Sequence, residues 1–354
     1  MGFRVRGDGD RQRPLAMDLT LIAVAVVVVA AAGVVGYRAA YQSLYSPSAF
    51  VVNYLDLLAG GRAADALQVP GVGIDSADLE AAGVDVAASD ALLRSTALAP
   101  LTDVHVVDEQ ADGDITRVHV EYQAGGNAGS TVFEVQQDGW IGFLPSWRFA
   151  KTPLAVVDLT VLGAMQFTVN GFTMDKRQVS AAGVDADPAA PVPLLVFTPG
   201  LYSISVDTSI SATPGVAVLA DSPLTQLPIE VQAQPTTSFV QVVQEKVDAF
   251  LTQCAEQQVL QPTSCPFGRF VQNRIDGPPT WSIVKMPQVT VLPSGENWII
   301  PNTEGTAHIE VDVTMIADDT KQHLSEDVPF VINGTITILP DGRASIVVTG
   351  PDTR

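Results

Sequence analysis

Hydrophobic and polar residues alternate with a period of two along much of the chain beyond residue 100. In residues 115–124 (ITRVHVEYQA), for example, every second side chain from Val118 to Ala124 is apolar, as in a half-buried antiparallel strand. The dipeptides Asp112-Gly113 and Asp138-Gly139 have hairpin chemistry and separate such segments. After Gly139, the sequence WIGFLPSWRFA predicts a further strand whose aromatic side chains cover a helix. The pattern therefore predicts an antiparallel meander.

A helical pattern precedes this meander. After Pro47, the sequence SAFVVNYLDLLAGGRAADAL repeats apolar residues at spacings of three and four, as an amphipathic helix does. Gly60-Gly61 interrupts the pattern, and residues 88–97 are expected to form another short helix. A helix followed by a curved antiparallel meander is an α+β layer. We therefore expect residues 47–151 to form one domain.

The next segment, residues 154–234, has no convincing helical periodicity. Short stretches of alternating apolar and polar residues are separated by dipeptides typical of turns. These dipeptides are Asn170-Gly171, Pro199-Gly200, Pro214-Gly215 and Ser222-Pro223. Several short strands at such spacing predict a small β-sandwich.

The last segment, residues 236–350, returns to the plan of the first. Residues 238–260 form the most regular helical pattern after the N-terminal region, with Ser238 as its expected N-cap. Its apolar positions share one helix face: Phe239, Val243, Val247, Phe250, Leu251 and Cys254. Four predicted strands follow. The sequence thus predicts an α+β protein in which two domains of one architecture flank the β-sandwich.

Residues 19–37 are apolar throughout and carry no charge. As a helix they would span about 28 Å, close to the hydrocarbon thickness of a bilayer. The excess of arginine before this segment places residues 1–18 in the cytoplasm and the rest of the chain outside. The alternatives are a signal peptide cleaved near Ala30-Ala31-Ala32 and a buried helix of a soluble domain. Because the apolar run exceeds the 7–15 residues usual in signal peptides, we expect a single transmembrane helix in the plasma membrane, in contact with lipid.

The chain is strongly acidic, with a formal net charge of −20. The first 37 residues are nearly neutral, so the acidic charge belongs to the part expected outside the membrane. Such a surface repels phosphate backbones, which excludes nucleic acid as a partner. Lysine is scarce, whereas alanine, valine and glycine are plentiful, a composition similar to that of actinobacterial proteins of high-GC genomes.

The two cysteines of the chain are Cys254 and Cys265. An even number of cysteines in an oxidising compartment favours a disulfide. Closing a loop of about 12 residues stabilises a fold by about 3 kcal/mol in the chain-entropy model. Two separate buried thiols are the alternative. A metal site lacks a third cysteine or a histidine nearby, so we expect a Cys254–Cys265 disulfide and no metal or other cofactor.

Candidate catalytic chemistry is sparse. His308, Glu310 and Asp312 alternate along one predicted strand, and His119 and Glu121 repeat the pattern. We interpret both sets as solvated faces, because the residues between them are isoleucine and valine. No G-x-S-x-G motif occurs, and neither cysteine has the setting of a nucleophile. An enzyme of this architecture would need carboxylates or histidines pointing inward between sheet and helix, where valine, isoleucine and phenylalanine stand instead. We expect no catalytic residue and no enzymatic activity.

Two further features each allow two interpretations. Trp281, after a proline-rich stretch, and Trp298, expected in a loop, could line a groove for a glycan or peptide or could form the rim of the core, which we prefer. Asn333-Gly334-Thr335 matches an N-glycosylation sequon, but Asn-Gly is equally a hairpin turn, the interpretation adopted here.

The two segments of helix and meander resemble the cystatin-like, or nuclear-transport-factor-like, α+β fold. An anchor followed by such a domain and a β-module is similar to the order in TcaA-like membrane proteins of Gram-positive bacteria. Within the middle segment, Val169-Asn170-Gly171 and residues 197–202 (FTPGLY) resemble the V-x-G and P-G-x-Y turns of PEGA-type surface modules. The resemblance implies a non-catalytic module facing the cell envelope, with no functional residues to carry over.

The sequence therefore predicts a membrane-anchored, extracytoplasmic binding or scaffolding protein of the bacterial cell envelope. Its expected partner is wall polymer or another envelope protein. One alternative is a sensor of envelope stress or of an antibiotic, which would need a membrane partner for its output. Another is a hydrolase or isomerase with a pocket between helix and sheet. A space filled by apolar side chains favours the scaffold, and a pocket lined by carboxylates or histidines favours the enzyme.

Overall fold

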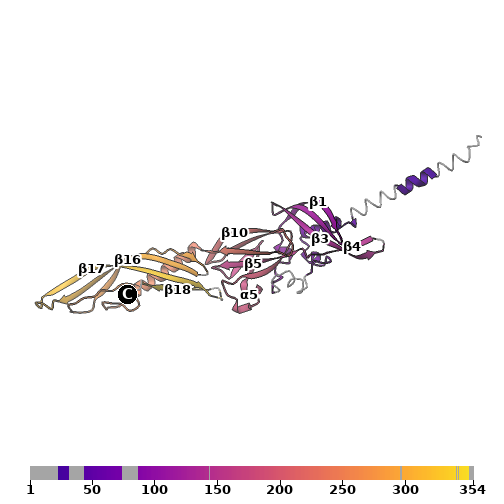
Figure 1. Ribbon diagram of the computed structural model, residues 1–354. Coiled ribbons are helices and arrows are strands. Elements are labelled where there is room, and N and C mark those ends of the chain that lie inside the picture. Colours follow the sequence, from indigo (N-terminus) through magenta and orange to yellow (C-terminus); the bar gives the residue numbers. More distant parts are fainter. Residues whose placement is uncertain are drawn as a thin grey trace, which may run out of the picture.

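The computed structural model describes residues 23–31, 44–73, 87–142, 144–295, 297–339, 341 and 343–350. They form an α+β protein whose sheets are mostly antiparallel, as predicted. Figure 1 shows three modules arranged end to end in an elongated molecule. We define the first module as residues 44–73 and 99–151, the middle module as residues 87–98 and 152–235, and the third module as residues 236–350.

The predicted membrane segment, residues 19–37, lies largely outside the described residues. Residues 23–31 within it are helical, with exposed valines. In the described parts of the chain, no helix combines the length and the apolar character needed to cross a bilayer. The membrane anchor therefore stays a prediction.

The first module is a four-stranded antiparallel meander that packs against one long helix. Its elements are α2 (Pro47–Ala59), α3 (Ala63–Ala66), β1 (Leu101–Asp112), β2 (Ile115–Ala124), β3 (Asn127–Ile141) and β4 (Leu144–Phe149), with sheet order β1-β2-β3-β4. Helix α2 begins where the Ser46 hydroxyl accepts a hydrogen bond from the Ala49 backbone N–H, and Pro47 occupies the first helical position. Its buried face packs against the sheet, with Tyr54 in ring contact with Phe133 and Phe149.

Two local predictions in this region are wrong. Residues 88–97 contain only one 3₁₀ turn, η1 (Ser95–Ala97), because the backbone of Ser89 pairs with the strand that contains Leu195. Asp138-Gly139 is not a hairpin turn. It lies inside β3 at a register shift between Gln137 and Gly139, where a β-bulge extends the strand to Ile141.

The middle module consists of two facing sheets. The five-stranded sheet has the order β12-β10-β9-β6-β7 and the three-stranded sheet the order β11-β5-β8, in which β11 and β5 are parallel. The elements are β5 (Leu154–Leu162), β6 (Gln166–Val169), β7 (Phe172–Asp175), α5 (Lys176–Val179), η2 (Gly183–Asp185), β8 (Val192–Phe197), β9 (Gly200–Asp207), β10 (Ser211–Ala220), β11 (Gln226–Gln232) and β12 (Gln234–Pro235). Alternate residues of both sheets fill one shared core. The predicted Asn170-Gly171 turn is present between β6 and β7.

The third module repeats the plan of helix and antiparallel sheet. Its elements are α6 (Thr237–Ala255), β13 (Arg274–Ile275), β14 (Thr280–Lys285), β15 (Leu292–Ser294), β16 (Asn297–Thr314), β17 (Lys321–Ile338) and β18 (Ala344–Thr349). Thr236, not Ser238, caps α6, because its hydroxyl accepts from the Phe239 backbone N–H at 3.2 Å. Phe250 is only half-buried, so the centre of the buried stripe runs through Val247 and Leu251.

Two other predictions for this module are corrected. Trp298 lies in β16 rather than in a loop, since the strand accommodates Pro301 at a register shift between Ile300 and Thr303. The Asn333-Gly334 pair lies inside β17 and forms no turn. Glycine is required there because a Cβ atom on Gly334 would come within 2.6 Å of the Val347 carbonyl oxygen on β18.

Buried side chains join the first module to the middle one. The Tyr54 hydroxyl, on α2, donates to the backbone oxygens of Pro153 (3.2 Å) and Thr198 (3.0 Å). Leu154 and Phe197 of the middle module are buried in the core of the first. The two hydrophobic cores therefore meet without an intervening linker.

Residues 87–98 strengthen this junction by joining the middle module, although they precede the first sheet in the sequence. Apolar side chains among them belong to the middle core: Ala91, Leu92 and Ala97. The Asn170 side chain donates to the Ala97 backbone oxygen at 2.7 Å, so the β6–β7 turn also tethers this segment.

A second junction joins the middle module to the third. Met165 and Ala186 of the middle module are buried in the third module's core. Trp298 is fully buried and packs against Gly163, where a Cβ atom would lie only 2.8 Å from the indole nitrogen. Its ring also contacts Phe239, with centroids 5.4 Å apart. The β-module and the third sheet are thus in direct contact.

Candidate functional site

Most of the residues that the sequence singled out contribute to the packing or cross-linking of the fold. Cys254 and Cys265 form the predicted disulfide, with Cα atoms 5.8 Å apart. Cys254 is the last buried residue of α6, and the loop that the bridge closes runs on to Phe267, whose ring packs on Trp281 and Phe330. The disulfide therefore ties the end of the helix to the loop that covers the third core.

The two histidine-bearing strand faces point away from the cores, as predicted. The intervening residues are buried, at 5% exposure or less: Val118, Val120, Ile309, Val311 and Val313. His308 pairs with Asp327 at 2.6 Å, and His323 pairs with Asp312 at 2.8 Å, both across β16 and β17. No group of three or more metal-ligating side chains is found among the described residues.

The space between helix and sheet is occupied by apolar side chains in both α+β modules. In the first module, Tyr54, Phe133 and Phe149 meet there with the aliphatic residues of α2 and β2. In the third, Trp298 and Phe239 fill it with isoleucines of β16 and β17. Trp281 is buried at the margin of the same core and donates its indole N–H to the Val259 backbone oxygen, so both tryptophans belong to the core.

A small cleft lies at the junction of the middle and third modules. Its volume is about 190 Å³. It is lined by the β5–β6 loop, the start of α5, the β9–β10 turn and the end of β17: Ala164, Met165, Gln166, Asp175, Arg177, Thr208, Ser209, Ile210, Ser211, Ile338 and Asp341. Ligand sites usually measure about 300–1,000 Å³. The cleft is therefore smaller than the usual ligand site.

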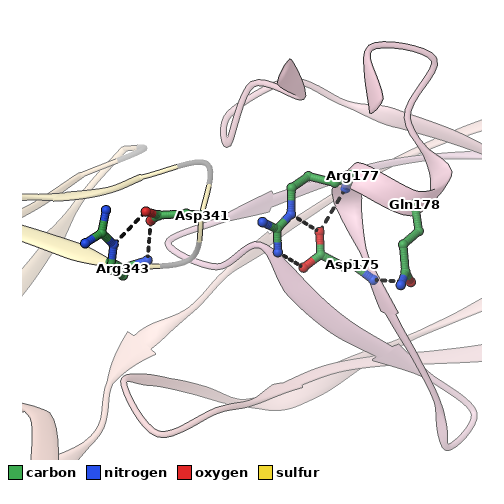
Figure 2. Close-up of polar contacts among 5 residues, drawn as sticks. All are labelled: Asp175, Arg177, Gln178, Asp341 and Arg343. Carbon is green, nitrogen blue, oxygen red and sulfur yellow. Dashed lines mark hydrogen bonds and ion pairs between the residues drawn. The ribbon is translucent and has the colours of Figure 1, made fainter. Parts of the chain in front are cut away.

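Asp175 and Arg177 form the middle module's side of the cleft. Asp175 is the N-cap of α5, and its carboxylate accepts hydrogen bonds from the Arg177 backbone N–H and from the guanidinium Nε (2.8 Å) and Nη2 (2.7 Å). The Gln178 side chain completes a capping box on the Asp175 backbone N–H (Figure 2). The guanidinium holds the pKa of Asp175 below its ordinary value, and the carboxylate raises the pKa of Arg177.

Asp341 and Arg343 face this pair from the β17–β18 connection (Figure 2). The Asp341 carboxylate accepts from the Arg343 backbone N–H and, at 2.6 Å, from the guanidinium Nε. These bonds, aided by the charge of Arg177, hold the pKa of Asp341 below its ordinary value. The charge of Asp341 in turn helps to raise the pKa of Arg177. Each aspartate is thus paired within its own module, and the charges of Arg177 and Asp341 influence each other across the cleft.

Both carboxylates of the cleft stay ionised at neutral pH, whereas a general acid or base works best with a pKa near the working pH. Each guanidinium is already paired with its own aspartate, so little unpaired charge remains for a ligand. The geometry suits a contact region between two modules more than a ligand site.

Lys176, next to these residues, is fully buried. Its ammonium donates to the backbone oxygens of Val161 (2.7 Å) and Pro188, so it ties α5 to β5 and to the loop before β8. Burial lowers the pKa of Lys176 to about 8, a shift that the nearby charge of Asp187 opposes. Nothing in the sequence distinguishes Lys176, because a single lysine in the polar stretch DKRQ is typical of a solvated surface residue.

The hairpin of β16 and β17 forms the end of the molecule far from the helix of residues 23–31 (Figure 1). A groove of about 310 Å³ lies beside this hairpin. Phe270 and Leu324 are among its lining residues, and Phe270 is 72% exposed. Ile316, on the β16–β17 connection, is equally exposed. This end therefore presents apolar side chains to solvent.

Two of the segments that line the cleft have recognisable sequence patterns. Asp175 followed three residues later by Gln178 is the pattern of a capping box, and Asp341-Gly342 is a turn dipeptide. Nothing in the sequence places these two turns, more than 160 residues apart, at one junction. No protein-family model matches this sequence, and a search of the curated proteins returned no match.

Proposed function

We propose that this chain is a non-enzymatic binding or scaffolding protein of the bacterial cell envelope. Residues 19–37 anchor it in the plasma membrane, with residues 1–18 in the cytoplasm and the three modules outside. The first and third modules follow the cystatin-like plan and flank a β-sandwich, in an order similar to that of TcaA-like proteins. Wall polymer or another envelope protein is its partner.

The observation that carries this proposal is the way the modules are joined. Buried side chains, not linkers, connect them: Tyr54 and Phe197 at one junction, Trp298 and Met165 at the other. Interfaces of this kind resist bending because separating them would expose apolar surface to water. A rigid, elongated molecule can hold its far end at a fixed distance from the membrane, which is the task of a scaffold.

The packing within the α+β modules supports a non-enzymatic role. A pocket enzyme of this architecture would direct carboxylates or histidines into the space between helix and sheet. Apolar side chains fill that space in both modules. The disulfide between Cys254 and Cys265 supports a location in an oxidising compartment.

Topology is tested by adding protease to intact spheroplasts that express the full chain with an N-terminal tag. We expect the modules to be digested and the tag to be protected. A digested tag beside protected modules would show the opposite orientation, and release of untagged modules into the medium would show cleavage.

Binding is tested with a photo-crosslinking amino acid in place of Phe270 at the far end of the molecule. Val184, which is 77% exposed in the middle module, is the matched control position. We expect crosslinks to wall fragments or to one envelope protein from position 270 and none from position 184. Equal yields from both positions would contradict a binding surface at the far end.

A further inference from the structure

The tip of the β3–β4 hairpin exposes large apolar side chains. Trp140 is 68% exposed and Ile141 is 74% exposed. Residues 139–147 (GWIGFLPSW) contain no charged residue, although the chain as a whole is strongly acidic. Exposed apolar patches on otherwise polar proteins mark surfaces that contact a partner or a membrane.

The backbone of the hairpin presents Trp140 on a particular face. The bulge at Asp138-Gly139 shifts the register, so that Trp140 pairs with Pro145. Paired residues of antiparallel strands share a face, and Pro145 shares its face with Trp147 two residues later. Trp140 therefore lies on the face of the sheet that packs against α2, beyond the first residues of that helix.

The hairpin is tied to the part of the chain that leads to the proposed anchor. The Trp147 indole N–H donates to the Tyr45 backbone oxygen at 2.8 Å. In Figure 1, the β3–β4 hairpin projects at the same end of the molecule as the helix of residues 23–31. Leu44, beside Tyr45, is 67% exposed and adds to the apolar surface at this end.

Chain length limits how far this surface can lie from a bilayer. Tyr45 follows Tyr37, the last residue of the apolar run, by eight positions. This stretch spans about 28 Å if fully extended and about 12 Å if helical. From the level of Trp147, the tip of the hairpin extends a further three residues or so, about 10 Å of strand. A bilayer that holds residues 19–37 is therefore within reach of the tip.

We propose that the β3–β4 hairpin inserts Trp140 and Ile141 into the interfacial layer of the outer leaflet, as a second membrane contact beside the anchor. This inference rests on the anchor included in the proposed function. Tryptophan favours the membrane interface, where its ring is shielded and its N–H meets water and headgroups. Because residues 139–147 carry no positive charge, apolar burial and not headgroup charge drives the contact, which is insensitive to salt.

The test uses the full chain in lipid nanodiscs with a single reactive thiol. Both native cysteines are held in the disulfide, so Ile141→Cys supplies the only thiol for an environment-sensitive fluorophore. Val184→Cys is the matched control, because Val184 is also apolar and highly exposed but lies in the middle module. Doxyl-labelled lipid is then added to the discs as a quencher.

We expect blue-shifted emission and several-fold stronger quenching at position 141 than at position 184, at low and at high salt. Nanodiscs that hold the protein but give equal, weak quenching at both positions would overturn the hairpin contact and leave the anchor standing. Blue-shifted emission without lipid quenching would overturn it in favour of a protein partner or a second copy. A chain that does not enter nanodiscs at all would overturn the anchor and, with it, this inference.

Discussion

At the scale of single residues, two buried polar groups bond to backbone oxygens: Tyr54 at the first junction and Lys176 within the middle module. The Tyr54 hydroxyl and the Lys176 ammonium are both fully buried, and each donates to two carbonyl groups from separate segments. Burying an unpaired donor costs free energy, and a buried charge resists ionisation even when it is hydrogen-bonded. Lys176 is therefore the residue whose contribution to stability depends most clearly on pH.

We predict that Lys176→Met abolishes a rise in stability between about pH 8 and pH 10.5. Burial lowers the pKa of Lys176 to about 8 from an ordinary value of 10.5. In this window the Lys176 site binds more protons in the unfolded chain than in the folded one, so this residue makes the free energy of unfolding increase with pH. Below about pH 8 both states are charged and the penalty of burying the charge is constant.

Urea denaturation at about pH 7 and about pH 10, followed by circular dichroism, measures this difference. Lys246→Met is the control, because Lys246 is exposed on α6 and its loss should leave the pH dependence intact. A Lys176→Met protein with the same gain in midpoint as the wild type would show that the ammonium is not responsible.

At the scale of elements, sequence periodicity identified helix α6, whereas packing determined which of its residues lie at the centre of the buried face. The predicted stripe is largely correct, since Phe239, Val243, Val247, Leu251 and Cys254 are buried. Phe250 lies at the flank of the stripe, where it packs against the core but is only partly buried. Neighbouring positions on one helix differ in burial according to the partner surface, which periodicity does not describe.

We predict that Leu251→Ala destabilises the third module by about 2–5 kcal/mol, since it removes a fully buried side chain and leaves a cavity. Lys246→Ala, on the exposed face of the same helix, should change stability by less than about 0.5 kcal/mol. Hydrogen exchange of the α6 amides in the full chain reports the effect. Equal protection of α6 in the two variants would show that the buried face of the helix is assigned wrongly.

At the scale of the whole molecule, the function proposed here depends on rigid junctions. The junction of the middle and third modules depends on the close approach of Trp298 to the backbone at Gly163. The alternating charges of Asp175, Arg177 and Asp341 lie beside it. The Asp175–Arg177 ion pair lies within the middle module and the Asp341–Arg343 pair within the third, so the buried aromatic contact across the junction is the main source of stiffness.

We predict that Gly163→Ala loosens this junction. Gly163 has φ +81°, and an added Cβ atom would lie 2.8 Å from the Trp298 indole nitrogen, so the ring must move. Gly171→Ala is the control, since Gly171 has φ +86° but no atom within 4 Å of the added Cβ. Both variants carry the same backbone strain, and only the first creates the clash.

Small-angle X-ray scattering should show a broader distribution of interatomic distances for Gly163→Ala than for Gly171→Ala. Exchange of the amides in the β5–β6 loop should also be faster in the first variant. Identical scattering curves would mean that the junction does not depend on this contact.

The sequence by itself determined the features that depend on local periodicity and spacing. It indicated the α+β class, most strands, the stripe of α6 and the Cys254–Cys265 disulfide, because alternation, helical spacing and a short loop are properties of neighbouring residues. The sequence-based prediction failed where strand pairing overrode a local turn pattern. Asn333-Gly334 and Asp138-Gly139 have turn chemistry, but strand pairing on both sides holds them within β17 and β3.

Only the tertiary structure decided which segments far apart in the chain meet. It placed residues 87–98 on the middle module, buried Lys176 between β5 and the loop before β8, and brought Asp341 opposite Arg177. It also left Trp140 in solvent, although the sequence predicted a strand here whose aromatic side chains cover a helix. Burial and electrostatic surroundings are set by contacts between residues separated by tens to hundreds of positions, and no local pattern records such contacts.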